Sequence, residues 1–301
     1  MCGITFTTCS KKTNSSKIVY AVNIQKLIEK IIQSKNNDKN IEKLLNLVWI
    51  FKNDISFLNY YESKKEQSII KKCCLQLKKF LLTADGDKAK KIKDIKWILD
   101  EELKIRFEFV KSYCKGSKID NSTIIFFKTL NSVVNSINLL ETRGRDSLGL
   151  QLSISLDKDK NNIDLVKDKK FENNLFVKVK KNKIFINKIY KTYNIFGSLG
   201  DNMKIILNMF KKDQFILSII KGGLFENINI TTHTRWASVG EVNLANTHPV
   251  MNSNKDKGLE PLIFSVMNGD IQNHEEIISS IDKFKIHNKD KNLSDTLALS
   301  L

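Results

Sequence analysis

The sequence predicts an α+β protein in which a long helical segment interrupts a β-rich domain. Two observations carry this prediction. Stretches rich in β-branched residues, or alternating between apolar and polar residues, occur at residues 2–9 and again from residue 148 onward, as expected for strands. Between them, over residues 18–125, apolar residues recur at the three- and four-residue spacing of helices.

The first strand is predicted at "CGITFTTC", residues 2–9. Apolar residues at helical spacing then run from Ile24 to Ile32 and from Ile70 to Leu81. The stretch "IKDIKWILDEELKIRFEF" predicts another amphipathic helix, and the apolar positions from Leu130 to Leu140 predict one that ends before "ETRGRDSLG". We expect this helical segment to lie outside the sheets and to supply no catalytic group.

The remaining sequence predicts mixed strands and helices. "LGLQLSISL" alternates as a strand, and "LFVKVKKNKIFINKIY" predicts a hairpin with its turn at "KKNK". "GDNMKIILNMFKKD" predicts a helix with Asp201 as its N-cap. "TTHTRWASVG" and "LIFSVMNGD" each predict a strand followed by a turn, "NHEEIISSIDKF" predicts a helix, and "SDTLALSL" resembles the start of another.

The composition allows one large domain or two modest ones, with 301 residues of which 41% are hydrophobic. The 50 Lys and Arg exceed the 33 Asp and Glu, giving a net charge of +17, a balance typical of proteins that bind nucleic acid or anionic membranes. Lysine is spread through polar stretches such as "DKDKNN", and no aromatic-basic motif of an RNA-binding sheet appears. We therefore attribute the charge to a compositional bias and expect no nucleic-acid partner.

The five cysteines, at positions 2, 9, 73, 74 and 114, form no CxxC pair of a zinc site. Cys73 and Cys74 fall on an apolar helical stripe, which predicts that they are packing residues. The sequence has neither a signal peptide nor a stretch of about 18 apolar residues that could span a membrane. We expect a cytoplasmic protein with reduced thiols and no membrane contact.

All four histidines, at 233, 248, 274 and 287, lie in the last quarter of the chain. Their surroundings, "THTRW", "NTHPV" and "QNHEE", lack the H-x-x-x-H and H-x-x-E-H spacings of metal sites. We therefore predict no metal site.

The opening residues "MCGI" raise a different possibility. A small residue at position 2 lets the initiator methionine be removed, which would leave Cys2 with both a thiol and a free α-amine. Their reference pKa values are about 8.5 and roughly 7.7–8.0, so one residue can hold a nucleophile and its own proton acceptor near neutral pH. The alternative is that Cys2 is only a small packing residue.

A thiol nucleophile of this kind needs oxyanion donors, and "MNGD" offers the Asn268 amide and the Gly269 backbone N–H. An amino-acid substrate needs a cation for its carboxylate, for which Arg235 and the Ser238 hydroxyl are candidates. Its ammonium group needs an anion, for which Asp295 is a candidate. Each residue taken singly is also typical of a solvated turn.

Six motifs connect these residues: "MCGI", "RGRDSLGL", "THTRWASVG", "NTHP", "VMNGDIQNHEE" and "SDT". In this order they resemble the glutaminase domain of class II glutamine amidotransferases. "HTRWA" further resembles the branch that makes glucosamine 6-phosphate from fructose 6-phosphate. The phosphoribosylamine-forming branch usually has tyrosine where Trp236 stands, and asparagine synthetases have an H-x-R-L motif instead.

The resemblance implies that Cys2 is the nucleophile, that its α-amine is the base, and that Asn268 and Gly269 form the oxyanion hole. It implies that Arg235 and Ser238 bind the glutamine carboxylate, and that Asp295, with Gly269, holds the ammonium group. Trp236 is expected near the path by which ammonia leaves. The remaining implied residues are structural: a turn near the nucleophile formed by Arg143, Gly144, Asp146 and Ser147, and support of the loop after Arg235 by Asn246 and His248. No cofactor is implied.

The sequence departs from the family pattern at four places, one of which is a smaller insertion between the turn at Arg143 and the motif at Arg235. Ser238-Val239-Gly240 stands where the family has T-H-G, which predicts weaker glutamine affinity. Met267 precedes Asn268-Gly269 where the family has histidine. The helical segment is an insertion, so the resemblance covers residues 2–9 and roughly 130–301.

The resemblance implies an αββα sandwich of the N-terminal-nucleophile class over residues 2–17 and 126–301, incomplete at its C-terminus, with residues 18–125 as a helical insertion. Such a domain would hydrolyse the glutamine side-chain amide through a Cys2 thioester. It would pass ammonia to a C-terminal acceptor domain similar to a sugar-phosphate isomerase, through which the protein would form a homo-oligomer. Two alternatives stay open: a non-catalytic relic or fragment acting as a binding module, and a glutaminase domain serving another acceptor such as phosphoribosyl pyrophosphate.

Overall fold

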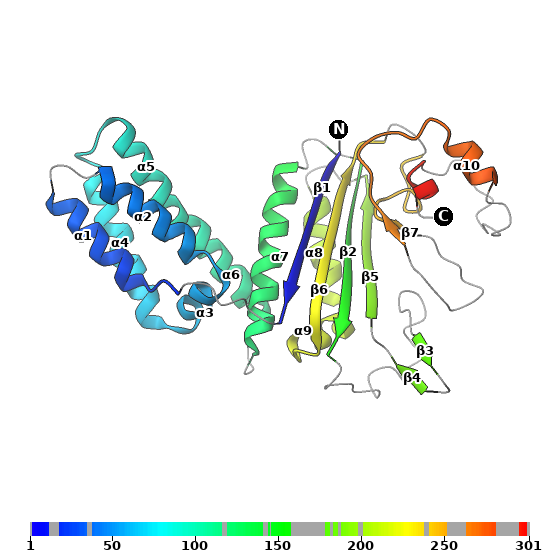
Figure 1. Ribbon diagram of the computed structural model, residues 1–301, viewed down its shortest axis with the longest axis horizontal. Coiled ribbons are helices and arrows are strands. Elements are labelled where there is room, and N and C mark those ends of the chain that lie inside the picture. Colours follow the sequence, from blue (N-terminus) through cyan, green and yellow to red (C-terminus); the bar gives the residue numbers. More distant parts are fainter. Residues whose placement is uncertain are drawn as a thin grey trace. The chain divides into compact units, whose positions relative to one another are not determined.

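The structure is a computed structural model, and two compact units make up the chain (Figure 1). The sheet unit comprises Met1–Lys11 and Ser132–Leu301, and the helical unit comprises Lys12–Asn131. The residues that the structure describes are 2–11, 18–34, 38–115, 119–140, 144, 146–157, 178–180, 183–185, 188–197, 201–237, 241–251, 263–280 and 295–299. The second boundary between the units falls inside a helix, α7 (Asn121–Leu140), a few residues beyond the boundary predicted at residue 126.

The helical unit contains α1 to α6, the π-helical segment η1 and the first part of α7. The bounds are α1 Ala21–Gln33, α2 Asp38–Phe51, α3 Asp54–Glu62, α4 Lys64–Phe80, α5 Gly86–Trp97, η1 Ile98–Glu102 and α6 Leu103–Tyr113. The predicted helices near residues 24 and 70 are confirmed as α1 and α4. The helix predicted over 92–109 is confirmed as a continuous helical run of α5, η1 and α6. Its middle, η1, is π-helical, and the flanking residues keep αR backbone angles.

The core of the helical unit is formed where α1 packs on α4. Ile24 and Ile28 of α1 and Cys73 and Leu77 of α4 are fully buried there. Burial raises the pKa of the Cys73 and Cys74 thiols to about 12. Both thiols are therefore protonated near neutral pH, and their predicted role as packing residues is confirmed.

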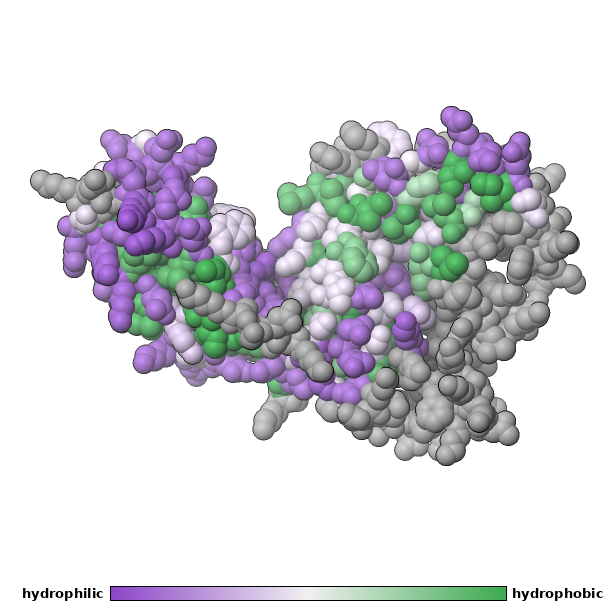
Figure 2. Space-filling view, viewed as in Figure 1, coloured by the Kyte–Doolittle hydropathy of each residue, from purple (hydrophilic) through white to green (hydrophobic). Residues whose placement is uncertain are grey.

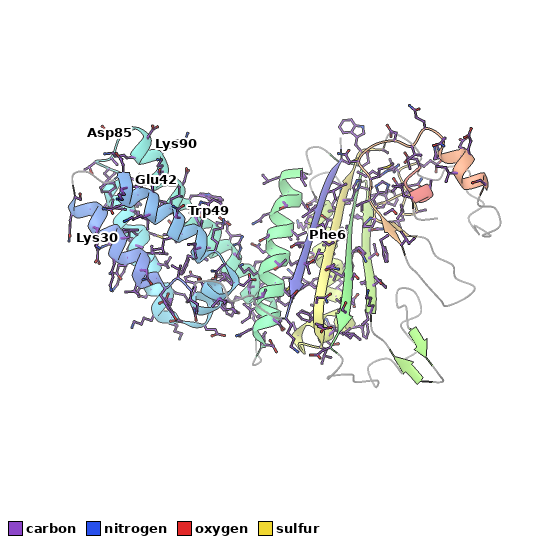
Figure 3. All side chains as sticks on the ribbon, viewed as in Figure 1. Phe6, Lys30, Glu42, Trp49, Asp85 and Lys90 are labelled. Atoms are coloured by element: carbon purple, nitrogen blue, oxygen red, sulfur yellow. The ribbon has the colours of Figure 1, made fainter. Side chains whose placement is uncertain are left out.

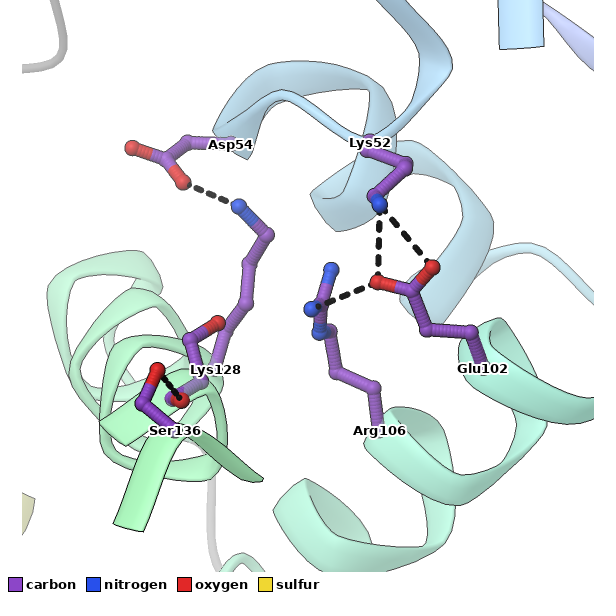
Figure 4. Close-up of polar contacts among 7 residues, drawn as sticks. Lys52, Asp54, Glu102, Arg106, Lys128 and Ser136 are labelled. Carbon is purple, nitrogen blue, oxygen red and sulfur yellow. Dashed lines mark hydrogen bonds and ion pairs between the residues drawn. The ribbon is translucent and has the colours of Figure 1, made fainter. Parts of the chain in front are cut away.

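Ion pairs join the turn after α2 to η1 and α6, and join α3 to α7, within the helical unit (Figure 4). Glu102 Oε1 pairs with Lys52 Nζ at 2.8 Å and with Arg106 Nη2 at 3.0 Å. Lys128 Nζ pairs with Asp54 Oδ1 at 2.6 Å. The side chains of Lys52, Glu102 and Arg106 are 18%, 14% and 8% exposed, so solvent screens these pairs little.

The sheet unit is built on a four-stranded antiparallel sheet in the order β1-β6-β2-β5. The strands are β1 Gly3–Ser10, β2 Ser147–Leu156, β5 Lys188–Phe196 and β6 Phe225–Arg235. Two short pairs accompany it: β3 (Lys178–Lys180) with β4 (Lys183–Phe185), and β7 (Val250–Met251) with β8 (Phe264–Ser265). The first pair confirms the predicted hairpin around "KKNK".

Helices of the sheet unit are the last part of α7, α8 (Asn202–Lys212), α9 (Gln214–Lys221) and α10 (His274–Ser280), with a 3-10 turn η5 at Asp295–Leu299. Helix α8 was predicted, but the Asp201 side chain makes no capping hydrogen bond at its start. Helix α9 was not predicted. The molecule is thus of mixed α and β class with an antiparallel sheet, as the sequence predicts.

The two faces of the sheet differ. On one face, Leu150, Leu152 and Ile230 are buried, and α8 packs on β2 and β5. Asp213 ties this layer together, because its carboxylate accepts hydrogen bonds from the Tyr193 hydroxyl at 3.0 Å and from the first turn of α9. The opposite face carries Ile4, Gln151 and His233, among others, and Arg235 lies at the end of this face.

That opposite face is open along β1. Phe6 is 64% exposed and Ile4 is 42% exposed, and Figure 3 shows Phe6 on the near side of β1. Figure 2 shows apolar side chains gathered at the end of the sheet unit where β1 begins and α7 ends; exposed residues there include Leu139. No helix among the described residues is long and apolar enough to cross a membrane.

Substitution Glu102→Gln tests the ionic network. The neutral amide would leave two largely buried cations without their counter-charge, so we expect the free energy of unfolding to fall by about 3 kcal/mol. Urea denaturation followed by circular dichroism measures this. The control is Glu42→Gln, which removes the more exposed pair with Lys91 and should leave the transition unchanged. Equal effects of the two substitutions would contradict the assignment.

Candidate active site

Strand register brings Cys2 to Arg235. Gly3 of β1 pairs with Thr234 of β6, so the residue before Gly3 lies beside the residue after Thr234. The Gly3 N–H also donates a hydrogen bond to Thr234 Oγ1 at 3.0 Å, which locks the register at this point. On the other side of β6, Ser147 of β2 pairs with Arg235 and is buried.

A pocket of about 170 Å³ opens at this end of the sheet. Its lining comes from the start of β1, the end of β6 and three segments that follow it: Cys2, Arg235, Trp236, His248, Met267, Asn268, Gly269, Asp270 and Asp295. The pocket therefore brings together all the residues that the sequence predicts as catalytic. It also brings together three of the four predicted substrate-binding residues, Arg235, Trp236 and Asp295. The fourth, Ser238, lies outside the described residues, as does the structural residue Arg143.

Cys2, just before β1, is held by the Trp236 backbone and the Asn268 side chain. Its Sγ accepts a hydrogen bond from the Trp236 N–H at 3.4 Å and lies 3.8 Å from the Trp236 carbonyl oxygen. The Cys2 N–H donates to Asn268 Oδ1 at 3.2 Å. The Cys2 thiol, just before β1, is partly exposed, whereas Cys9 within β1 is buried, so of these two thiols the one at position 2 is accessible.

Arg235 is a buried cation, with only 4% of the residue exposed. Burial lowers the pKa of its guanidinium, and interactions with Cys2, Asp295 and Asp146 oppose that shift. An arginine in a protein stays protonated, so the pocket keeps a fixed positive charge. Arg235 Nη1 donates to the Glu241 carbonyl oxygen at 3.4 Å.

The predicted supporting residues lie around this arginine. Asn246 Nδ2 donates to the same Glu241 carbonyl at 3.1 Å, which fixes the loop after β6. Asp146 donates its N–H to the Arg235 carbonyl at 3.0 Å and accepts the Ala237 N–H at 2.6 Å. A Cβ on Gly144 would lie 2.4 Å from the Thr234 carbonyl oxygen, so only glycine fits there.

Asp295 is one of two aspartates that line the pocket, together with Asp270. It begins η5 and is 4% exposed. Its Oδ2 accepts the Ile271 N–H at 2.7 Å, which ties η5 to the segment that follows Asn268 and Gly269. A fixed cation and a carboxylate thus line one small pocket together with an accessible thiol.

Two buried histidines support the segment that carries Asn268. His233 Nε2 lies 2.9 Å from the Met267 carbonyl oxygen, and His248 Nδ1 lies 3.4 Å from the same Nε2. A carbonyl oxygen only accepts, so His233 carries its proton on Nε2. Burial lowers the pKa of His233 to about 4 and that of His248 to about 3. Both rings are therefore neutral near pH 7.

Sequence reasoning missed His233, which it weighed only as a metal ligand. The available signal was strand alternation: residues 233 and 235 of a strand point to the same face. Met267 and Asp270, which also line the pocket, were missed because their positions depend on a loop. Among the described residues, no group of three or more His, Cys, Asp or Glu side chains is arranged to hold a metal ion.

Comparison with known proteins assigns neither a family nor a function to the chain. No protein-family model matches the chain, and a search of curated proteins gives no match. The sequence motifs and the pocket where they meet are the observations that bear on function.

The buried histidines predict acid sensitivity. Their folded-state pKa values lie below the ordinary value of 6.5, so between about pH 6.5 and pH 4 the unfolded chain binds more protons than the folded one. Stability should then fall as pH falls through this window, by about 1.4 kcal/mol per pH unit for each histidine. Urea midpoints measured from pH 7.5 to 4.5 test this.

The histidine contribution is isolated by the variant His248→Gln. In this variant the slope of the unfolding free energy against pH should be smaller by the contribution of one histidine. The stability at pH 7.5 will also change, because packing around residue 248 is lost. An identical slope in the variant and the natural chain would show that His248 does not stay neutral in the folded protein.

Proposed function

We propose that the chain is the glutamine-hydrolysing part of a class II glutamine amidotransferase, with Cys2 as its N-terminal nucleophile. One observation carries the proposal: the thiol of the second residue, an arginine, an aspartate and an Asn-Gly pair, distant in sequence, line a single pocket. The six ordered motifs that resemble this family supply all of these residues.

The size and charges of the pocket support an amino-acid substrate. A volume of about 170 Å³ is small beside the roughly 300–1,000 Å³ of sites for cofactors and drug-sized ligands. Arg235 can bind a carboxylate with two parallel N–H donors, and Asp295 can bind an ammonium group. A free α-amino acid carries both groups on one carbon, which leaves its side chain to extend toward Cys2.

The proposed chemistry requires removal of Met1, which turns the Cys2 N–H into an α-amine. This amine takes the proton of the thiol, and the thiolate attacks the side-chain amide carbon of glutamine to form a C–S bond. The tetrahedral intermediate collapses with transfer of the proton to the leaving nitrogen, so ammonia departs and a glutamyl thioester remains. Water then cleaves the thioester and releases glutamate and the free thiol.

Asn268 and Gly269 are suited to the oxyanion of that intermediate. Because Asn268 Oδ1 faces the Cys2 N–H, the amide directs its NH₂ group elsewhere and can donate to an oxyanion. No heavy atom lies within 4 Å of the position a Cβ would take on Gly269. A substrate oxygen can therefore approach the Gly269 backbone closely. Trp236, which is 53% exposed at the pocket edge, would border the path of ammonia.

The same proposal extends to the second sheet and to the acceptor of the ammonia. The four-stranded sheet would be the first sheet of an αββα sandwich, with the second on the face that carries Ile4 and Phe6. The released ammonia would serve an acceptor domain, and "HTRWA" favours fructose 6-phosphate as the acceptor. A homo-oligomer follows from the same resemblance.

The variant Cys2→Ala tests the nucleophile. In protein whose Met1 removal has been verified by mass spectrometry, glutamate release from glutamine should fall by at least about 10³-fold. The control is Cys9→Ala, which removes the buried thiol of the same strand and should keep most of the activity. Hydrolysis that persists in Cys2→Ala would refute the proposed nucleophile. An absence of hydrolysis in the natural chain with a free Cys2 would favour the non-catalytic binding module.

Substitution Asp295→Asn tests substrate binding. The loss of a charge-assisted contact to the substrate ammonium should raise KM for glutamine about 10- to 100-fold, with a smaller effect on kcat because the contact exists in ground and transition states alike. Asp201→Asn makes the same charge change outside the pocket and should leave both constants unchanged. A fall in kcat without a rise in KM would contradict a binding role for Asp295.

A further inference from the structure

The exposed face of α4 carries a regular pattern of lysines that the proposed function does not use. The helix, drawn in cyan in Figure 1, buries Ile70, Cys73 and Leu77 against the rest of the helical unit. We call the opposite side the lysine face; its residues are Lys64, Lys65, Ser68, Lys71, Lys72, Leu75, Lys78, Lys79 and Leu82.

The lysine face repeats every seven residues. Lysine pairs start at positions 64, 71 and 78, and the single residues Ser68, Leu75 and Leu82 follow at the same interval. Seven residues fall only about 20° short of two helical turns, so the repeat stays on one side of the helix. Fourteen residues of α-helix rise about 21 Å, which is the length of the row from the first pair to the third.

These six lysines differ from others in the same unit. Lys52, Lys88, Lys91, Lys96 and Lys128 each pair with a carboxylate. Within the part of the chain that the structure describes, no carboxylate pairs with a lysine of the lysine face. The face therefore presents a row of positive charge that a compositional excess of lysine does not by itself explain.

Two leucines lie on the midline of the lysine face. Leu75 is 54% exposed and Leu82 is 85% exposed. At 100° per residue, Lys71 and Lys78 lie on one side of Leu75, and Lys72 and Lys79 lie on the other. Leu82 follows the last turn of α4, where its N–H still bonds the Lys79 carbonyl. The surface thus offers apolar side chains flanked by cations on both sides.

The chemistry that satisfies both features is an anionic surface with an apolar layer beneath it. Nucleic acid supplies phosphates, but single-strand binding relies on stacked aromatic side chains, and the lysine face has none. Arginine, which binds phosphate bidentately, is also missing from it. An anionic bilayer supplies phosphate and carboxylate head groups for the lysines and acyl chains for the leucines.

We propose that the lysine face of α4 binds the surface of anionic lipid membranes. The helix would lie parallel to the bilayer, with Leu75 and Leu82 below the head groups and the lysine stems reaching up to them. The sequence predicts no membrane contact because it lacks a spanning segment, but surface binding requires none. The inference is independent of the pocket and of its proposed chemistry.

Vesicle co-sedimentation of the full chain tests the inference. The vesicles contain phosphatidylcholine with 30% phosphatidylserine, and pure phosphatidylcholine vesicles serve as the neutral comparison. We expect binding to the anionic vesicles alone, and a fall in the partition coefficient of at least tenfold for the variant K71Q/K72Q/K78Q/K79Q. The matched control K26Q/K30Q/K39Q/K43Q changes four exposed lysines of α1 and α2 and should reduce binding less than threefold.

A second variant, L75Q/L82Q, separates a lipid partner from a polyanion in solution. It leaves the charge unchanged and should weaken vesicle binding severalfold, while affinity for a 20-nucleotide RNA stays the same. Thermal melting verifies that each variant is folded. Three results would each overturn the inference: no binding to anionic vesicles, equal losses in the two lysine variants, or vesicle binding that is unaffected by L75Q/L82Q.

Discussion

The register between β1 and β6 is the constraint on which the site depends. Gly3 pairs with Thr234, and a slip of one residue would turn Cys2 to the opposite face of the sheet, away from Arg235. The register is possible because residue 3 has no side chain: a Cβ there would lie 2.7 Å from Leu140 Cβ and 2.8 Å from Thr234 Oγ1. Close packing of α7, β1 and β6 thus explains in physical terms why a glycine follows Cys2.

This register places the positive charge of Arg235 in a buried position, and other residues of the site offset that charge. Arg235 at the end of β6 has lost water, and the carboxylates of Asp295 and Asp146 offset that loss. Each carboxylate also accepts a backbone N–H, from Ile271 and from Ala237 respectively. The groups that balance the arginine therefore also fix the backbone around the pocket, so charge and shape are set by the same contacts.

The sequence predicts local structure well and tertiary placement less well. Alternation identified β2, and the apolar spacing identified α1 and α4, because burial of one face dictates these periods. The π-helical turn at Ile98–Glu102 cannot be recognised from the spacing of apolar residues, because it alters the backbone without a change in residue type. Cys2 and Arg235 were predicted to act together from the motifs, whereas the contact of His233 with Met267 depends on how a distant loop returns to the sheet. The helix α7 also crosses the boundary that the family resemblance placed at residue 126.

The central claim is that Cys2, freed of Met1, faces a bound amino acid whose charges are held by Arg235 and Asp295. The most direct measurement is a crystal structure of the matured chain after reaction with a diazoketone analogue of glutamine. We expect a thioether at Cys2 Sγ, the ligand carboxylate within hydrogen-bond distance of the Arg235 guanidinium, and the ligand ammonium beside Asp295. An adduct at another cysteine, or a ligand bound with its carboxylate away from Arg235, would contradict it.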